Sequence, residues 1–578
     1  MFASRAMNSE AGSDMLGSAM SRGTRIDRGV PKDEKRRCPS VGTMARYRRA
    51  ALVCTLCSCF LVASALADGV DAVGQSITIA LTQEPPNLDA TRSTDLVSFF
   101  IISHVNEGLL RYDRRGRLVP GVAASWQNEG RRMTFHLKET ARWSDGLPVV
   151  ASDFVYGLRL VANPAHGSPY IAIMQPLRNA AKIRQGQLPP TALGVTAPDN
   201  RTVVIDLEEP CGYCPSLMSH GAFFPVNEAF HRGQGERYGA EPEHLLYNGP
   251  FELTRWTHGA SLTLQKNADY WDAGAIRLRE INIGYITEDN RTRLNLFQDG
   301  RIALARLGAE TVREAVAQKL KVRTFRSGGL AYLTFNLRPG HPTADARLRK
   351  AVQMVFDPEE FVNRVIGIPG YVPAYSFFPA WINGASGKFQ DEHPPARIPR
   401  DVGAARALVA AVRAEAGGNV PELTLITTTS VTGNRIAEYL QGIIKRHLGL
   451  EVKVDQQIFK QYLAKARGGE FDIALSSWYP DFDDIVTYAD LLGSTNPNNR
   501  SRYESRPYDQ ALEVVVTSID PTSRMRAAAE LQALLIRDVP VLPMAETGSA
   551  YVQHRRLRGV VRRVMGADPD YTYAWVVP

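Results

Sequence analysis

Hydrophobic and polar positions alternate most clearly in the region that begins at residue 422. The stretch Glu422–Thr427 alternates apolar and polar side chains, a pattern that predicts a half-buried β-strand. A helical repeat follows, and we expect Asn434 to cap the start of this helix and Gly449 to end it. Its apolar side chains fall on one face of the predicted helix: Ile436, Tyr439, Leu440, Ile443, Ile444 and Leu448.

Two more predicted strands, at 451–455 and 471–477, flank a short predicted helix at 461–467. With the elements before them, they make a βαβαβ unit. Open α/β sheets bind ligands beyond the carboxyl ends of their strands, so the segment after Ser477 is a candidate binding region.

The first half of the chain shows shorter strands of the same kind. An alternating run at 133–137 predicts a strand, and the Ser144–Gly146 stretch predicts a turn. We expect Ser152–Asp153 to cap a helix. Two alternating runs, 251–256 and 261–265, predict a hairpin-like pair of strands.

An apolar segment near the N-terminus has the pattern of a secretory signal peptide. Residues 44–49 contain three arginines and form a positively charged n-region, residues 50–63 form the apolar region, and Ala65–Ala67 matches a cleavage site, so we expect cleavage after Ala67. The apolar stretch is shorter than the ~20 residues that span a bilayer. The start codon, Met1 or Met44, stays open, as does lipid attachment at Cys59.

Composition and charge predict a globular protein without a nucleic-acid partner. Its 578 residues suggest about three domains, with 44% hydrophobic and 22% charged residues. The net charge is +8, but residues 1–67 carry 11 basic and 5 acidic residues of the totals of 68 and 60. The remaining 57 basic and 55 acidic residues nearly cancel. The body therefore has no charge excess that would attract DNA or RNA.

Two cysteines remain after the leader, and they form the motif Cys211-Gly-Tyr-Cys214 directly after an alternating run at 202–207. A strand that leads into such a motif is typical of a thiol oxidoreductase, which is the alternative function of a different class. Against it, Pro210 and Pro215 bracket the motif. We favour a small static disulfide, or two unpaired small residues, in an oxidising compartment.

Catalytic and metal-binding motifs are missing from the sequence. It contains no nucleophile elbow, zinc-protease motif, phosphate-binding loop or dinucleotide fingerprint. Zinc at the cysteine pair would have His220 as only a third ligand, whereas a structural site needs four. We therefore expect no enzyme activity, no catalytic residue, no metal and no cofactor.

A family resemblance becomes specific over residues 106–156. The matching residues are Asn106–Leu110, Asp113, Gly116, Pro120–Gly121, Ala124–Trp126, Thr134–Leu137, Trp143–Gly146, Pro148 and Ser152–Tyr156. Further matches are Asn248–Phe251, Lys266–Asn267, Tyr270–Asp272, Phe335–Asn336, Arg347, Arg349–Ala351, Phe471–Asp472 and Trp478. This pattern resembles the family 5 extracellular solute-binding proteins, which include the oligopeptide- and dipeptide-binding proteins of ABC transporters.

The resemblance implies an α/β fold of the class C periplasmic-binding-protein type, with two lobes, a hinge and an extra inserted domain. The implied borders are a leader at 1–67 with the signal peptide at 44–67, domain I at 68–106, 229–328 and 546–578, domain II at 107–228, and domain III at 329–545.

The resemblance also implies a binding mode, in which an extended peptide is held through its main chain. In oligopeptide-binding members a carboxylate three residues after a tryptophan pairs with the peptide's α-ammonium, and Asp481 matches that position after Trp478. The other implied ligand contacts are main-chain groups of Ser477, Trp478, Tyr479, Asp95 and Leu96 and the pocket side chains Tyr170, Tyr332, Phe459 and Trp478.

Some positions depart from the family pattern. Leu475 and Gly433 stand where some members carry basic residues that face the ligand's carboxylate, and Pro480 removes a backbone donor. Peptide length therefore stays open. Members of the same fold also bind murein peptides, nickel chelates, haem, opines or sugars, and these solutes remain alternatives. We expect a monomer in the periplasm that delivers its ligand to ABC permease subunits in the inner membrane.

Overall fold

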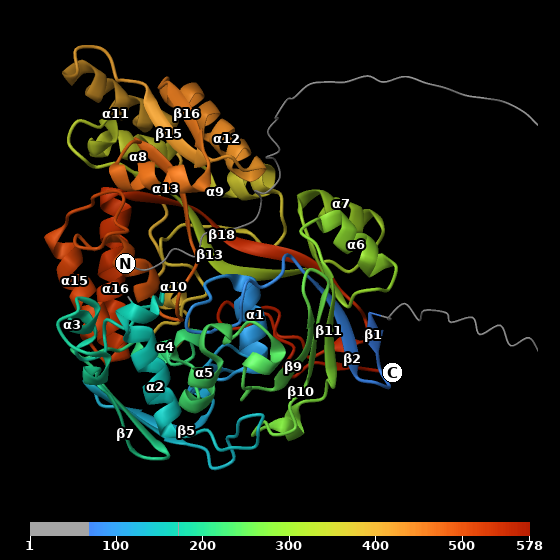
Figure 1. Cartoon of the computed structure of the whole chain (residues 1–578). Helices are drawn as coiled ribbons and strands as arrows, with labels where there is room; N and C mark the ends of the chain where they lie inside the picture. The colour runs from blue at the N-terminus through green and yellow to red at the C-terminus, as the bar shows by residue number, and fades with distance from the viewer. Residues whose placement is uncertain (1–68, 172) are drawn as a thin grey trace, which may run out of the picture. The chain divides into compact units, whose positions relative to one another are not determined.

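The computed structural model describes residues 69–171 and 173–578 (Figure 1). The predicted signal peptide, its cleavage site after Ala67 and Cys59 lie outside these residues. Within them, no helix has both the length and the apolar character that crossing a membrane requires.

One sheet gathers strands from both ends of the first half of the chain. Its five strands are β1 (Val70–Asp71), β2 (Ser76–Leu81), β11 (Glu280–Ile286), β10 (Ser261–Lys266) and β9 (Phe251–Thr257), in that order. The predicted hairpin is confirmed, because β9 and β10 pair antiparallel. Parallel pairing of β2 with β11 joins segments about two hundred residues apart. Helix α1 (Leu96–Val105) contributes Phe100, Ile101 and Ile102 to the same apolar core.

The largest sheet in the described part is built around two long antiparallel strands. These are β13 (Arg323–Phe335) and β18 (Val541–Gln553), which lie side by side in Figure 1. The other strands are β12 (Leu304–Leu307), β14 (Val372–Pro373), β15 (Leu423–Thr428), β16 (Val452–Gln457) and β17 (Ile473–Trp478). The order is β12-β18-β13-β17-β15-β16, with β14 against β18. The predicted borders after residues 328 and 545 fall inside β13 and β18, and the three-domain division stays a prediction.

The predicted βαβαβ unit is confirmed, since β15 pairs parallel with both β16 and β17. Helix α12 (Val431–Leu448) and helix α13 (Phe459–Gly468) connect these strands. The predicted cap at Asn434 is wrong: the Ser430 hydroxyl accepts from the Gly433 N–H and begins the helix one turn earlier. Gly449 ends it in the left-handed conformation, as predicted.

A third sheet contains β5 (Ala123–Asn128), β6 (Arg132–Leu137), β8 (Thr202–Asp206) and β7 (Val195–Asp199). Helix α2 (Ala151–Ala162) packs on it, but the predicted cap at Ser152–Asp153 is wrong. Asp153 lies within the first turn, where its carboxylate accepts from the Val150 N–H and from the Trp143 indole, both at 3.0 Å. The carboxylate thus reaches back to the helix start, a role that a sequence pattern does not distinguish from a cap.

The remaining helices cover the sheets or connect them. They are α3 (Ala180–Arg184), α4 (Cys214–Leu217), α5 (Glu228–Gln234), α6 (Asn290–Gln298), α7 (Ala309–Ala317), α8 (Ala346–Val355), α9 (Pro358–Glu360), α10 (Phe389–Glu392), α11 (Val402–Glu415), α14 (Val486–Ala489), α15 (Arg506–Thr517) and α16 (Pro521–Asp538). Short paired strands are β3 (Leu110–Tyr112) with β4 (Leu118–Pro120), and β19 (Leu557–Arg558) with β20 (Trp575–Val576).

Several residues of the family pattern are buried polar groups that hold distant segments together. The Asn248 side chain accepts from the Glu107 N–H at 3.0 Å and donates to the Glu107 carbonyl at 2.9 Å. The Glu107 carboxylate accepts from the Tyr270 hydroxyl and the Trp271 indole. Because buried polar groups are costly without partners, these positions are fixed by the fold.

Candidate functional site

The end of β17 and the loop after it form the centre of the candidate site. Trp478 is buried, and its indole N–H points to the Thr487 hydroxyl at 3.5 Å. The same hydroxyl accepts from the Asp481 N–H at 3.0 Å. Thr487 therefore fixes the turn that presents the half-buried Asp481 at the carboxyl end of the strand.

A buried tyrosine lies under this turn. The Tyr488 hydroxyl donates to the Gly328 carbonyl, which also accepts from the Trp381 indole at 3.0 Å. Burial raises the pKa of Tyr488, and the negative charges of Glu546 and Asp481 raise it further. Strand pairing also relates Glu546 to the end of β17, since Leu330 of β13 pairs with Trp478 on one side and with Glu546 on the other.

Two more carboxylates follow in the loop. The Arg524 guanidinium bonds to Asp484 at 2.7 Å, and both side chains are almost fully enclosed. Asp483 makes no ion pair with any described residue. Its burial, with the neighbouring charge of Asp484, raises the pKa of Asp483 to about 7, and Lys388 acts in the opposite direction.

The cysteine motif contacts this loop. Cys211 and Cys214 form a disulfide in the structure, and both residues are buried. Between them, the Tyr213 ring stacks on Phe482 with centroids 5.0 Å apart. A catalytic disulfide has to expose a sulfur to its substrate, so the burial of both sulfurs disfavours the oxidoreductase alternative.

Three of the predicted pocket aromatics belong to one buried cluster. Tyr170, Tyr332 and Trp478 are 8%, 8% and 5% exposed, and all belong to the same apolar core. Phe459 packs instead on a smaller cluster and stacks on Tyr462 with centroids 6.4 Å apart. Phe459 therefore lies apart from the other three.

The predicted main-chain contacts occupy two places. Ser477 is exposed at the end of β17, and the half-buried Tyr479 follows Trp478. Asp95 caps helix α1 by accepting from the Ser98 N–H at 2.8 Å, and Leu96 is 67% exposed. The structure thus accounts for Asp95 as a helix cap, and the ligand contacts predicted for these five residues stay predictions.

Sequence reasoning did not find Tyr488, Trp381, Glu546 or Asp483 as members of this region. Asp483 lies in the same acidic loop as Asp481, so the run of acidic residues in the sequence could have identified it. Glu546 and Trp381 lie far along the chain from the loop, and only the pairing of β18 with β13 brings Glu546 near it.

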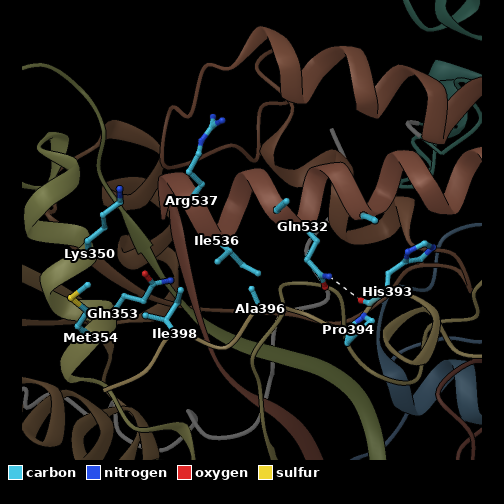
Figure 2. Close-up of a pocket in the computed structure, with 12 residues that line it drawn as sticks. Lys350, Gln353, Met354, His393, Pro394, Ala396, Ile398, Gln532, Ile536 and Arg537 are labelled. Atoms are coloured by element: carbon cyan, nitrogen blue, oxygen red, sulfur yellow. Dashed lines mark hydrogen bonds between the residues drawn. The ribbon is translucent and has the colours of Figure 1, made fainter. Parts of the chain in front are cut away.

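A separate groove lies elsewhere in the described residues. It encloses about 570 Å³ between α8, the segment at 393–398 and α16, and none of the predicted ligand contacts lines it. Figure 2 shows Lys350 and Met354 on one wall and Ile536 on the other, with the Gln532 amide bonded to the His393 carbonyl at 3.0 Å. Ligands of open α/β sheets bind at the carboxyl ends of the parallel strands, and this groove does not lie there. We therefore keep the candidate site at the end of β17.

Metal binding has no support in the part of the chain that the structure describes. No group of three or more His, Cys, Asp or Glu side chains there is arranged to hold an ion. His220, the third ligand considered for zinc, instead accepts at Nδ1 from the Ala222 N–H at 3.1 Å.

A mixed α/β fold with a binding segment at the carboxyl end of a parallel strand is typical of the solute-binding proteins. The model of the bacterial extracellular solute-binding proteins, family 5 middle region, matches residues 117–500. The chain belongs to this family, and the predicted α/β fold of the binding-protein class is confirmed.

Named relatives and solved structures agree with this assignment. The chain is 28% identical to the dipeptide-binding protein DppE of Bacillus subtilis, over 84% of this chain and 89% of DppE. It is 29% identical to the periplasmic murein peptide-binding protein MppA of Escherichia coli, over 81% of this chain and 87% of MppA. The structure of Listeria monocytogenes OppA bound to peptide aligns with a TM-score of 0.69 and 26% identity, over 87% of this chain and 99% of OppA.

Proposed function

We propose that the protein is an extracytoplasmic receptor that binds short peptides and delivers them to an ABC permease. The family assignment and the names of the similar proteins support this function. The observation that carries it is the position of Asp481, half-buried at the carboxyl end of β17 and three residues after a buried tryptophan. In this proposal Asp481 binds the amino terminus of the peptide.

Physical chemistry favours a carboxylate for this role. An α-ammonium that leaves water loses several kcal/mol of solvation unless a charged partner replaces the water. A main chain that continues β17 through Ser477 and Tyr479 would bind the peptide backbone as an added strand. Such binding recognises termini and length more than side chains.

The proposal includes how the protein works in the cell. The receptor is exported by its signal peptide, acts in the periplasm as a monomer without catalysis, and closes two lobes over its ligand by hinge motion. We assign the hinge to β13 and β18, because both strands extend past the stretch in which β13 pairs with β17, and the far end of β18 pairs with β12. Membrane permease subunits then receive the peptide.

Calorimetric titration tests the anchor. We expect trialanine with a free amino terminus to bind the native protein, and N-acetyl-trialanine to bind at least tenfold more weakly. Asp481→Asn should remove most of this difference, whereas the matched change Asp299→Asn at an exposed position should keep it. Equal affinity of free and acetylated peptides for the native protein would exclude Asp481 as the anchor of an amino terminus.

A further inference from the structure

Glu546 is a buried carboxylate with one unused oxygen. It lies on β18 and is 3% exposed. Its Oε1 accepts from the Ala380 N–H at 2.8 Å. Its Oε2 has no hydrogen-bond partner in residues 69–171 and 173–578, and the side chain makes no ion pair there.

Such a group is unfavourable in a protein interior unless something meets it. A buried acceptor without a partner loses its solvation without compensation, and a buried charge loses more. Burial raises the pKa of Glu546, and the attraction of Arg326 acts in the opposite direction. The Arg326 side chain is exposed, so it does not supply the missing partner.

The position of Glu546 places it at the edge of the candidate site. Leu330 of β13 pairs with Glu546 of β18 on one side and with Trp478 of β17 on the other, and Asp481 follows Trp478 by three residues. A Cβ atom added at Gly329 would lie 2.6 Å from Thr547 Oγ1 and 2.6 Å from Tyr479 Cε1. Tyr479, a predicted ligand contact, therefore packs beside the residue that follows Glu546.

Two cations of the candidate site already have partners. Of the nearby cations, Arg524 is bonded to Asp484, and Lys388 donates to the Trp381 carbonyl and the Asn383 side chain. The carboxylate of Glu546 keeps an unused acceptor among these groups. A ligand with more than one positive charge would complement this arrangement.

We propose that Glu546 is a second anchoring carboxylate, which pairs with a cationic side chain on the first residue of the bound peptide. This inference rests on the proposed function and adds that the receptor prefers peptides that begin with lysine, arginine or another diamino acid. The first residue is chosen because Glu546 and Trp478 lie on the two strands that flank Leu330, and Asp481, which follows Trp478, binds the amino terminus in the proposal.

A structural role gives a different expectation. A permanently protonated Glu546 that only supports the Ala380 N–H would not distinguish a charged ligand from a neutral one. The ligand-binding role and the structural role therefore predict different relative affinities for peptides that begin with lysine and with norleucine. Norleucine has a similar chain length but lacks the ammonium group.

The experiment is a calorimetric titration of three tripeptides, Lys-Ala-Ala, norleucine-Ala-Ala and Ala-Ala-Ala. We expect the native protein to prefer the lysine peptide over the norleucine peptide by at least tenfold. Glu546→Gln should reduce this preference to less than threefold. Glu513→Gln, which makes the same chemical change at an exposed position of α15, should retain the full preference.

The outcomes separate this inference from the proposed function. Binding of trialanine without a preference for lysine in the native protein would overturn the second anchor and leave the peptide receptor intact. Failure of all three peptides to bind would overturn both. Both of these results are measured on the native protein, so they overturn the inference even if the Glu546→Gln variant folds poorly. A preference that survives in a folded Glu546→Gln variant would also overturn it.

Discussion

Replacing Asp483 by asparagine should change how the stability of the protein depends on pH. The native state holds a proton on this carboxyl up to about pH 7, because burial and Asp484 raise its pKa to about 7. The unfolded chain releases the proton near pH 4. Stability from this group is therefore fully present at low pH and is lost as pH rises through the native pKa.

The magnitude follows from the interval between the two pKa values. Each pH unit in which only the native state keeps the proton contributes about 1.4 kcal/mol. Between about pH 5 and about pH 8, the native protein should therefore lose about 2–3 kcal/mol of unfolding free energy through Asp483. Asparagine does not titrate, so Asp483→Asn should lack this loss.

Urea unfolding, followed by tryptophan fluorescence at several pH values, measures the effect. The difference between the variant and the native protein should grow in favour of the variant by about 2–3 kcal/mol from about pH 5 to about pH 8. The control Asp299→Asn changes an exposed side chain and should run parallel to the native protein. Parallel curves for Asp483→Asn as well would refute the argument that this carboxyl is held protonated.

Three further predictions concern contacts that hold the fold. Arg349 donates to the carbonyls of Thr343, Ala344, Asp538 and Val539. Arg349→Lys should therefore lower the unfolding free energy, measured by urea titration, by about 2–4 kcal/mol. An unchanged unfolding midpoint would contradict this. The stacked rings of Tyr213 and Phe482 should show a coupling of about 1 kcal/mol in a double-mutant cycle to alanine, whereas additive effects would exclude a direct contribution. Burial alone would raise the pKa of Asp570, but the charges of Arg563 and His104 lower it. The ionised carboxylate therefore stabilises the native protein until the pH falls below about 4, and Asp570→Asn should remove this stabilisation. An acid unfolding profile of the variant that matches the native one would count against this.

Local elements of the fold followed from the sequence because short-range periodicity determines them. The alternation in Glu422–Thr427 predicted β15, and the helical spacing that ends at Gly449 predicted α12. The starts of helices were less predictable. Ser430 and Asn434 both satisfy a cap, and the choice depends on which backbone N–H the side chain reaches in the folded chain.

The candidate site followed only in part. The loop containing Asp481 was accessible because it lies directly after a predicted strand and matches a family position. Glu546 and Trp381 carried no local signal, because the pairing of β18 with β13 places Glu546 and a hydrogen bond to the distant Gly328 carbonyl places Trp381. The bonds of Asn248 and Glu107 explain why parts of the family pattern mark the fold rather than the ligand.

The central claim, that the receptor binds short peptides by their amino termini, is tested most directly by the small molecules that the protein carries. Mass spectrometry of the ligands released on unfolding, after purification from the periplasm under native conditions, identifies them without prior choice. The account predicts peptides of a few residues with free amino termini. Recovery of a sugar, a haem or a metal chelate in stoichiometric amount, with no peptide, would contradict it.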